Sequence, residues 1–425
     1  MTYNDAIEFL YQLRWFGAKF GLANTRKLAA LAGNPQESLR FIHVAGTNGK
    51  GSTCAMLESI YRIAGLRTGL FTSPHLVAFG ERIQVNRQTL TEGQVIRLVS
   101  EIQPLLAQFP PEEHPTFFEV VTVMALRHFA AQHCDLVVWE TGLGGRLDAT
   151  NIVTPLASVI TNIQYDHQKW LGETLPSIAA EKAGIIKPHV PILTATEDAD
   201  ALRVIRETAH TQAAPLTVVD PAVIDAPPLD ALELPLLGRH QKINASLALA
   251  TVTALSSRLP VTHDAILGGL ARVHWPGRLQ LIARPSGQRV LLDGAHNVGG
   301  AEILAEALKQ YFQGEPLTLV LGILQDKDLA GMCEVLAPLA DRILLVPVHS
   351  ERTASTQQLA QMCRRAQPAA QLQQFSSLAA ALADCAFAPF VTIAGSLYLV
   401  GEAMELLHLS PRTNLERELN EWRAA

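Results

Sequence analysis

Short apolar runs alternate with segments of helical periodicity along most of the chain. A strand buried on both faces gives a short continuous apolar run, whereas a helix repeats its apolar residues every three or four positions. The runs that predict strands are 41–45, 67–72, 135–140, 156–162 and 190–195. The segments that predict helices are 91–107, which opens with a capping box at Thr91, and 116–132 and 242–257. This order is typical of parallel sheets covered by helices, so we predict an α/β fold.

A second series of strands and helices begins near residue 288. Its strands are predicted in RVLLDG, LTLVLGI, RILLVPV and FVTIAG, with helices between them. The segment 276–288 holds two prolines and two glycines without a long periodic run, which favours a junction there. We therefore predict two domains, 1–280 and a smaller 288–425. The proline-rich span 215–235 predicts a long surface connection or short irregular strands within the first domain.

The composition is that of a folded globular protein. At 425 residues the chain is too long for one ordinary core, which also favours two domains. Hydrophobic residues make up 48% and charged residues 17%, which excludes a disordered or fibrous chain. The formal net charge of -6 leaves no broad basic surface of the kind that duplex nucleic acid needs.

Several features predict a soluble cytoplasmic protein. The five cysteines are scattered and contain no C-x-x-C pair, which is typical of a reducing compartment. The first twenty residues mix Asp5, Glu8, Arg14 and Lys19 into an apolar pattern, which predicts an amphipathic helix rather than a signal peptide. No uninterrupted apolar run approaches the length needed to cross a membrane.

The stretch 46–52, GTNGKGS, stands between an apolar strand and a helix. Glycines let backbone N–H groups close on an anion, the helix N-terminus adds partial positive charge, and Lys50 adds a full one. A glycine-rich turn can also serve packing alone, but this context favours a nucleotide phosphate. The spacing departs from G-x-x-x-x-G-K-[ST], because Val44 stands at the first glycine and Gly51 follows the lysine. A variant class of phosphate loop is implied.

Polar residues also follow other strands of the first domain, at the sheet edge where ligands gather. Glu140 ends DLVVWE and could reach a Mg²⁺ ion held on ATP, although a charged residue after a strand is also common at a plain surface. The glycine-rich loop 141–151 adds a cation and an acid. Asp166 and His167 follow a third strand; a lone histidine is usually structural, but this position favours a site. Lys182 is by default a solvated surface lysine.

The second domain presents a similar group after RVLLD. Asp293, His296 and Asn297 close this strand just before a helix that starts near Gly299. A capped turn would also use such residues. The strand-end position favours a ligand edge.

Eight regions of the chain carry motifs that occur together in one known family. They are GTNGKGS (46–52), TSPHL with ERI (72–83), ETGLGGRLDATN (140–151), DH (166–167), EKAGIIK (181–187), HWPGR (274–278), DGAHN (293–297) and GSLYLVGE (395–402). This order resembles the folylpolyglutamate synthase/dihydrofolate synthase family of the Mur ligase superfamily, of which the short phosphate loop is characteristic. The resemblance spans nearly the whole chain. It implies an N-terminal P-loop ATPase domain with a parallel-rich sheet and a smaller Rossmann-like C-terminal glutamate-ligase domain.

The resemblance implies an ATP-dependent ligase that joins L-glutamate to a folate through an acyl phosphate. The sequence GGRLDATN is similar to that of bacterial members that also join glutamate to dihydropteroate, so both activities are expected. The implied cofactors are ATP and Mg²⁺, and a need for a monovalent cation stays open. The implied partners are these small molecules, with no nucleic acid or membrane, and the family suggests a monomer.

Position by position, the resemblance assigns four groups of site residues. The nucleotide would be held by Asn48, Gly49, Lys50, Gly51, Ser52, Asn244, Arg278 and Asp293, and the metal by Ser73, Glu140 and His167. Substrates would contact Arg82, in the segment 71–83 that matches the family's loop over the folate site, and Ser396, near the incoming glutamate. The pterin-site positions of bifunctional members correspond to Thr116, Phe118, Arg146 and Asp148, and Lys50, Lys182 and His296 would be at the chemistry. Lys182 matches a lysine that is carbamylated in the family. The chain has RHQKIN where R-x-N often precedes Asn244, so a nucleotide contact from Arg239 or Lys242 stays open.

Two other functions fit part of the pattern. A related Mur-type ligase acting on another carboxylate would share the phosphate loop, but ligases for nucleotide-linked sugars usually carry a further N-terminal domain, and only 45 residues precede this loop. A nucleotide-gated binding protein without catalysis would share the fold. The intact set of Lys50, Glu140, His167 and Lys182 argues against it.

Overall fold

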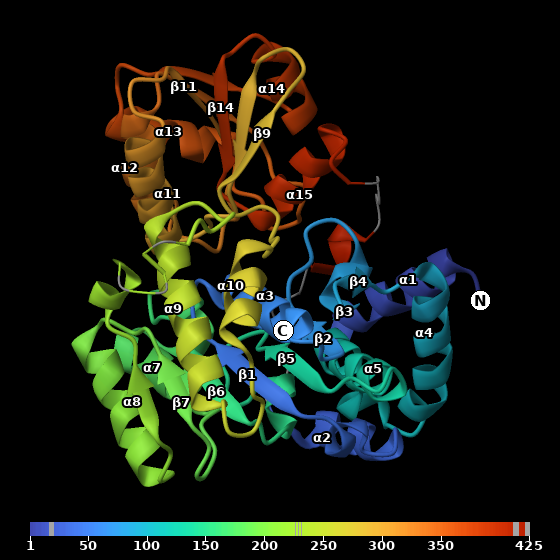
Figure 1. Cartoon of the computed structure of the whole chain (residues 1–425). Coiled ribbons are helices and arrows are strands. Elements are labelled where there is room, and N and C mark those ends of the chain that lie inside the picture. Colours follow the sequence, from blue (N-terminus) through green and yellow to red (C-terminus); the bar gives the residue numbers. More distant parts are fainter. Residues whose placement is uncertain (17–20, 226, 228, 231, 411–415, 421–425) are drawn as a thin grey trace. The chain divides into compact units, whose positions relative to one another are not determined.

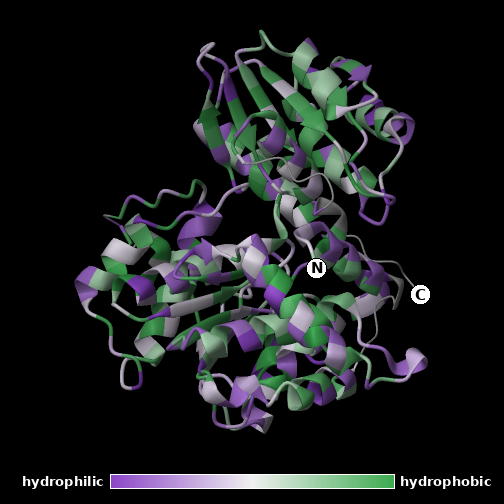
Figure 2. Ribbon diagram, turned by 90° about the vertical axis from the view of Figure 1, so that its right-hand side faces the viewer, coloured by the Kyte–Doolittle hydropathy of each residue, from purple (hydrophilic) through white to green (hydrophobic). Residues whose placement is uncertain are grey.

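The computed structural model describes all residues of the chain except 17–20, 226, 228, 231, 411–415 and 421–425. The chain divides into two compact units, each built from a sheet and its covering helices (Figure 1). The N-terminal unit comprises Met1–Pro235, Gln241–His274 and Glu418–Ala425, and the C-terminal unit comprises Leu236–His240 and Trp275–Arg417. Hydrophobic segments run through the strands of both sheets, and hydrophilic residues gather in loops and on outward helix faces (Figure 2). The predicted α/β class is confirmed.

The N-terminal unit is built on one sheet with the strand order β4-β3-β2-β5-β1-β6-β7-β8. Neighbouring strands from β2 to β8 are parallel, and β3 and β4 add an antiparallel edge. The strands are β1 (Phe41–Ala45), β2 (Thr68–Phe71), β3 (Ile83–Val85), β4 (Gln88–Thr89), β5 (Leu136–Glu140), β6 (Ala157–Ile160), β7 (Ile192–Thr194) and β8 (Leu216–Val218). All five strands predicted for this region are present. Strand β8 and a short 3-10 helix, Pro221–Asp225, lie within the proline-rich span.

The helices of this unit include the three predicted ones as α4, α5 and α9. The α-helices are α1 (Tyr3–Gln12), α2 (Ala23–Leu31), α3 (Lys50–Ile63), α4 (Glu92–Leu106), α5 (Phe117–Ala131), α6 (Gln168–Leu171), α7 (Leu175–Ala183), α8 (Ala199–Thr211), α9 (Arg239–Ala254) and α10 (His263–Ala271). Thr91 forms the predicted capping box, accepting from the N–H of Gln94 while the Gln94 side chain accepts from Thr91. The predicted N-terminal helix is α1, and residues 17–20 of that stretch lie outside the described residues.

The buried positions of β1 show how the sheet is covered. Phe41 packs with Val137, Trp139 and residues of α1, α4 and α5 in one large core cluster. Ala45, at the other end of the same strand, packs with residues of α7 and α8. Helix α3 connects β1 to β2 and packs against α10. Because the strands are parallel, the loops after β1, β5 and β6 all leave from the same edge of the sheet.

The C-terminal unit has a six-stranded sheet with the order β13-β12-β11-β14-β10-β9. Its strands are β9 (Gln280–Ala283), β10 (Arg289–Leu292), β11 (Leu317–Leu321), β12 (Arg342–Leu345), β13 (Gln371–Gln374) and β14 (Phe390–Ala394). Its helices are α11 (Val298–Tyr311), α12 (Leu329–Leu336), α13 (Thr356–Ala366), α14 (Leu378–Asp384) and α15 (Leu397–Leu406). The four strands predicted here are confirmed, and residues of α11, α12 and α13 share one core cluster with β10, β11, β12 and β14.

The structure differs from the sequence prediction in the segment 276–288. This segment contains β9, which pairs antiparallel with β10 at the edge of the C-terminal sheet. It lacks a strong apolar run because β9 alternates half-buried and exposed residues, as an edge strand does. The segment is therefore part of the C-terminal unit rather than a plain connection, and the domain boundaries 1–280 and 288–425 stay a prediction.

Candidate active site

The loop Gly46–Gly49 joins β1 to α3 and leaves no room for side chains at two glycines. Gly46 has φ 148° and Gly49 has φ 83°. A Cβ atom on Gly46 would lie 1.8 Å from the hydroxyl of Thr161, and one on Gly49 would lie 2.6 Å from Oδ1 of Asn244. The chain therefore needs glycine at both places, for backbone conformation and for space. The helix N-terminus at Lys50 is a suitable place for an anion.

Two lysine side chains converge on this loop. Nζ of Lys50 donates to the carbonyls of Gly46 and Thr47 at 3.1 and 3.0 Å. Nζ of Lys182, from α7, donates to the same Gly46 carbonyl at 2.7 Å. The default expectation that Lys182 is a solvated surface lysine is wrong, because only 4% of it is exposed. Burial, with the nearby charge of Lys50, lowers the pKa of Lys182 to about 7.

Helix α9 supplies two amide side chains beside the phosphate loop. Asn244 donates from Nδ2 to Oε1 of Gln241 at 3.0 Å, and Gln241 in turn donates from Nε2 to the hydroxyl of Ser52 at 3.3 Å. On the other side of the loop, the N–H of Asn48 donates to Oδ1 of Asn162 at 2.8 Å. The predicted nucleotide residues Asn48, Gly49, Lys50, Gly51, Ser52 and Asn244 thus belong to one cluster. Gln241 and Asn162 belong to it as well, and the sequence analysis did not include them.

Glu140 ends β5 and is 3% exposed. Its Oε2 accepts the backbone N–H of Ser73 at 3.0 Å, so two of the three predicted metal ligands are neighbours. His167 stands at the start of α6 with φ 51°, and its N–H donates to Oδ1 of Asp166 at 2.9 Å. In the described part of the chain, no three His, Cys, Asp or Glu side chains are grouped to hold a metal ion. The hard oxygen donors of Glu140 and Ser73 suit Mg²⁺.

Asp148 organises the loop that follows β5. Its Oδ2 accepts the N–H of Leu143 at 2.7 Å, and its Oδ1 accepts the N–H of Thr150 at 3.0 Å and the Thr150 hydroxyl. Burial raises the pKa of Asp148, while these hydrogen bonds oppose the rise. Both carboxylate oxygens therefore serve the loop itself, and a direct substrate contact from Asp148 stays a prediction.

A buried histidine, which the sequence analysis did not identify, continues this network. His43, in β1, is fully buried, and its Nε2 lies 2.9 Å from the hydroxyl oxygen of Thr150. Because that hydroxyl donates to Asp148, it accepts from His43, so the proton of the ring is on Nε2. Burial lowers the pKa of His43 to about 3. Trp139, in β5, also holds Thr150 in place, because its Nε1 donates to the Thr150 carbonyl at 3.0 Å.

The predicted pterin-side residues are divided between this loop and the start of α5. Thr116 caps α5 and donates from its hydroxyl to Oε2 of Glu119 at 2.9 Å. Phe118 lies against the loop, since a Cβ on Gly142 would be 2.5 Å from the end of its ring. Arg146 instead is 58% exposed in its side chain and pairs with Glu181 at 2.8 Å. Phe118 and Asp148 thus lie at the same loop, whereas Arg146 is held at the surface, and a substrate contact from Thr116 stays a prediction.

Arg82 is buried rather than presented to solvent. Only 3% of it is exposed, and its Nε donates to Nδ1 of His75 at 2.8 Å. Its Nη2 donates to Oδ1 of Asn420 at 2.6 Å, and the guanidinium lies over the ring of Phe117 at 5.3 Å. A contact between Arg82 and a substrate carboxylate stays a prediction.

The C-terminal unit places its predicted residues at the ends of β10 and β14. Asp293 accepts the N–H of Leu279 at 2.8 Å and of Ala295 at 2.9 Å, and burial raises its pKa. Arg278 is close to the loop after β10, since a Cβ on Gly294 would lie 2.4 Å from its Nη1. His296 donates from Nδ1 to the Gly294 carbonyl at 2.8 Å, and Ser396 caps α15.

A family model for the Mur ligase middle domain matches residues 44–222, and one for the Mur ligase glutamate ligase domain matches residues 277–396. The dihydrofolate synthase/folylpolyglutamate synthase of Bacillus subtilis is 39% identical over 364 residues, covering 80% of this chain and 84% of the relative. The Escherichia coli relative of the same name is 34% identical over 417 residues, covering 94% of each chain. The chain belongs to the folylpolyglutamate synthase/dihydrofolate synthase family. It is therefore an ATP-dependent ligase.

Solved structures of the folylpolyglutamate synthase family share this fold over nearly the whole chain. The Thermotoga maritima folylpolyglutamate synthase aligns with a TM-score of 0.84 at 32% identity, covering 98% of this chain and 99% of that one. The E. coli FolC protein, solved in complex with DHPP and ADP, aligns with a TM-score of 0.84 at 32% identity, covering 96% and 98%.

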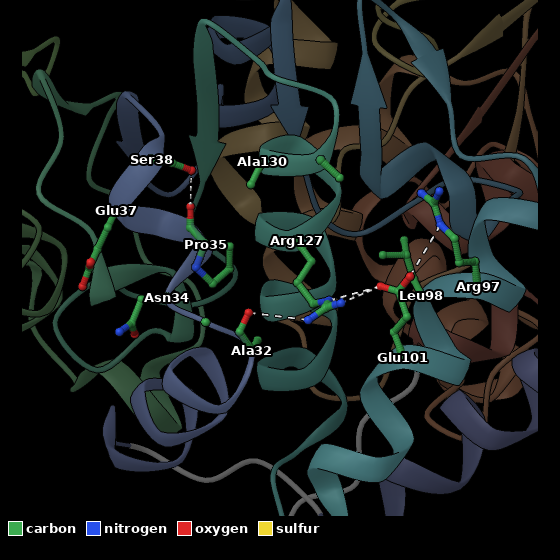
Figure 3. A pocket seen from close by; sticks show the side chains of 12 residues that line it. Ala32, Asn34, Pro35, Glu37, Ser38, Arg97, Leu98, Glu101, Arg127 and Ala130 are labelled. Atoms are coloured by element: carbon green, nitrogen blue, oxygen red, sulfur yellow. Dashed lines mark hydrogen bonds and ion pairs between the residues drawn. The ribbon is translucent and has the colours of Figure 1, made fainter.

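One cavity lies outside the candidate active site. It measures about 690 Å³ and is lined by residues around α2, α4 and α5, among them Arg97, Glu101 and Arg127 (Figure 3). Arg127 donates to Glu101 at 2.7 Å within it. Its lining residues precede β1 and β5 in the chain, so the cavity lies at the edge of the sheet opposite the phosphate loop and contains none of the predicted site residues.

Among the described residues, no helix is long and apolar enough to cross a membrane.

Proposed function

We propose that this chain joins L-glutamate to folates, and also to dihydropteroate, by ATP-dependent formation of an acyl phosphate. The observation that carries the proposal is the convergence of Lys50 and Lys182 on the carbonyl of Gly46, at the sheet edge that also holds Glu140. Phosphoryl transfer between two anions needs positive charge at this edge, which Lys50 and Mg²⁺ would supply, whereas Lys182, with a pKa lowered to about 7, is the site for the carbamate. The relatives named for both activities support the choice of substrates.

The residues of the N-terminal unit have distinct tasks in the first half-reaction. The N–H groups at the start of α3 hold the ATP phosphates, and Lys50 leaves its loop carbonyls to follow the transferred group. Mg²⁺, held by Ser73, Glu140 and His167, would supply charge neutralisation on the γ-phosphate. Gln241 and Asn244 keep α9 against the loop so that Ser52 faces the phosphates.

The second half-reaction adds glutamate. The glutamate amine attacks the acyl phosphate carbonyl, and the carbonyl bond to the phosphate oxygen breaks as phosphate leaves. We assign His296 and Ser396 to the glutamate side, and Arg278 and Asp293 to the nucleotide. The hydrogen bond from Nδ1 of His296 to the Gly294 carbonyl orients this ring, and the proton that the amine loses leaves with the phosphate.

The dihydropteroate activity rests on a small group of residues in the N-terminal unit. Thr116, Phe118 and Asp148 match the pterin side of bifunctional members, and Phe118 adds an aromatic face that suits a pteridine ring. The E. coli neighbour was solved with DHPP. We also propose that the protein is a cytoplasmic monomer whose substrates are small molecules.

The test uses purified protein with Mg-ATP, L-glutamate and one acceptor, either 7,8-dihydropteroate or a reduced folate monoglutamate. Mass spectrometry of the products decides the outcome. Glutamate added to both acceptors supports the bifunctional enzyme, and addition to one alone removes the other activity. If neither product forms while ATP still binds, the proposal fails, leaving another carboxylate acceptor or a nucleotide-gated binding protein.

A further inference from the structure

The described residues near the C-terminus return to the N-terminal unit. A 3-10 helix, Arg417–Asn420, follows the last strands and helices of the C-terminal unit. Leu419 is 1% exposed and belongs to the same core cluster as α1, α4 and α5. The segment is therefore anchored in the N-terminal unit by apolar burial.

Asn420, beside that anchor, closes a ring of three hydrogen bonds. Its Oδ1 accepts from Nη2 of Arg82 at 2.6 Å, and its Nδ2 donates to the carbonyl of His75 at 2.9 Å. Arg82 completes the ring by donating from Nε to Nδ1 of His75 at 2.8 Å. All three residues are at most 8% exposed. An amide is suited to this place because it offers one acceptor and one donor side by side.

The ring fixes the part of the chain that the proposed function assigns to the acceptor. His75 and Arg82 both lie in the segment 71–83, which matches the family's loop over the folate. The carboxylate of Glu81 secures the middle of this segment by accepting the N–H groups of Leu76 and Ala78 at 2.7 and 2.8 Å. Asn420 contacts His75 and Arg82, on either side of this middle part, so the segment is held both from within and by a residue 338 positions beyond Arg82.

The ring also sets the position of the guanidinium. Arg82 lies over the ring of Phe117, the residue between Thr116 and Phe118 of the proposed pterin side. A charged group in a buried network keeps its place only while its partners are present. Loss of Asn420 would remove one acceptor from Arg82 and one donor from His75 at once.

We infer that Asn420 is a positioning residue for the acceptor substrate, acting through Arg82 and His75; this inference rests on the proposed function. Asn420 does not touch the reacting atoms in this account. Its effect is to hold the segment 71–83 in one arrangement before the folate or dihydropteroate binds.

The test compares Asn420→Ala with Asn4→Ala, a matched control at an exposed position of α1 in the same unit. We expect Asn420→Ala to raise the KM for the acceptor by about tenfold, the scale of one buried hydrogen bond to a charged group, with the KM for ATP unchanged. Amide hydrogen exchange within 72–83 should become faster. Asn420→Asp keeps an acceptor for Arg82 but cannot donate to His75, so it should fall between wild type and Asn420→Ala.

Two results would overturn the inference. One is an active Asn420→Ala protein whose acceptor KM and exchange in 72–83 equal those of the control. The other is an Asn420→Ala protein in which the KM for the acceptor and the KM for ATP both rise and the free energy of unfolding falls as much as in Leu419→Ala. That result would show that Asn420 has a purely structural role. If the wild-type protein itself makes no product with either acceptor, the proposed function fails, and the inference falls with it.

Discussion

Lys182 should react with carbon dioxide to form a carbamate. Only the neutral amine reacts: a bond forms between Nζ and the CO2 carbon, giving R–NH–COO⁻, and one proton is released. At pH 7.5, a lysine with a pKa of about 7 is about three quarters neutral, whereas one at the ordinary 10.5 is neutral about once in a thousand. Burial thus raises the reactive fraction of Lys182 by nearly three orders of magnitude.

The assay is carbon-13 NMR of the protein equilibrated with labelled bicarbonate. Wild type should give a carbamate signal that is absent from Lys182→Arg, because a guanidinium stays protonated. Lys187→Arg is the matched control, since Lys187 is in the same segment and burial also lowers its pKa, but it is only part-buried. The signal should weaken as the pH falls below about 7, because Lys182 then takes up its proton.

A wild-type spectrum identical to that of Lys182→Arg would refute the reasoning. It would mean that the hydrogen bond from Nζ to the Gly46 carbonyl keeps the amine protonated in spite of burial. A carbamate signal that disappears in Lys187→Arg and persists in Lys182→Arg would show that Lys187, and not Lys182, carries the reactive amine. That result would also refute the prediction.

Three further changes test the site. Lys50→Ala should lower kcat for ligation by about a hundredfold or more, measured as ADP release with a folate acceptor, and a variant matching wild type would remove Lys50 from the chemistry. His43 has a folded pKa of about 3 and an ordinary value of 6.5, so the unfolded state takes up its proton first as the pH falls. Between pH 7.5 and 5, wild type should therefore lose about 2 kcal/mol of stability that His43→Gln does not lose, and equal losses in urea unfolding would contradict this. Gly142→Ala should raise the acceptor KM because its Cβ would displace Phe118, whereas Gly93→Ala, whose Cβ meets nothing within 4 Å, should leave KM unchanged. If the two glycine variants gave the same acceptor KM, Phe118 would not form part of the acceptor site.

The central strands and long helices could be predicted because their burial is visible locally. Strands β1 and β5 are buried at every position and appear as continuous apolar runs. Thr91 shows where α4 begins, through its capping box. By contrast, β13 has the sequence QLQQ and is mostly exposed, so its strand conformation comes from pairing with β12 and not from its own residues.

The glycine-rich loop between β1 and α3 could be predicted for a similar reason, since its glycines, lysine and flanking elements are adjacent in sequence. The environment of Lys182 could not be predicted from residue type, because its burial depends on Gly46, 136 positions away. His43 is hidden in an apolar run, and its role emerges only when Thr150 is brought beside it. Asn420 contacts Arg82 across 338 positions, and no local pattern marks such a partner.

Lys50 and Lys182 both donate to the carbonyl of Gly46, so the charge on one lysine affects the other and would also affect Mg²⁺ bound nearby. Two ammonium groups at one carbonyl would repel each other, so the charge of Lys50 adds to burial in lowering the pKa of Lys182. Carbamylation would replace that repulsion with attraction, since Lys182 would then carry a carboxylate. The new carboxylate would also repel the ATP phosphates unless a divalent cation stood between them. Because coupling between two ligands is reciprocal, bicarbonate should tighten Mg²⁺ binding by the same factor by which Mg²⁺ favours the carbamate.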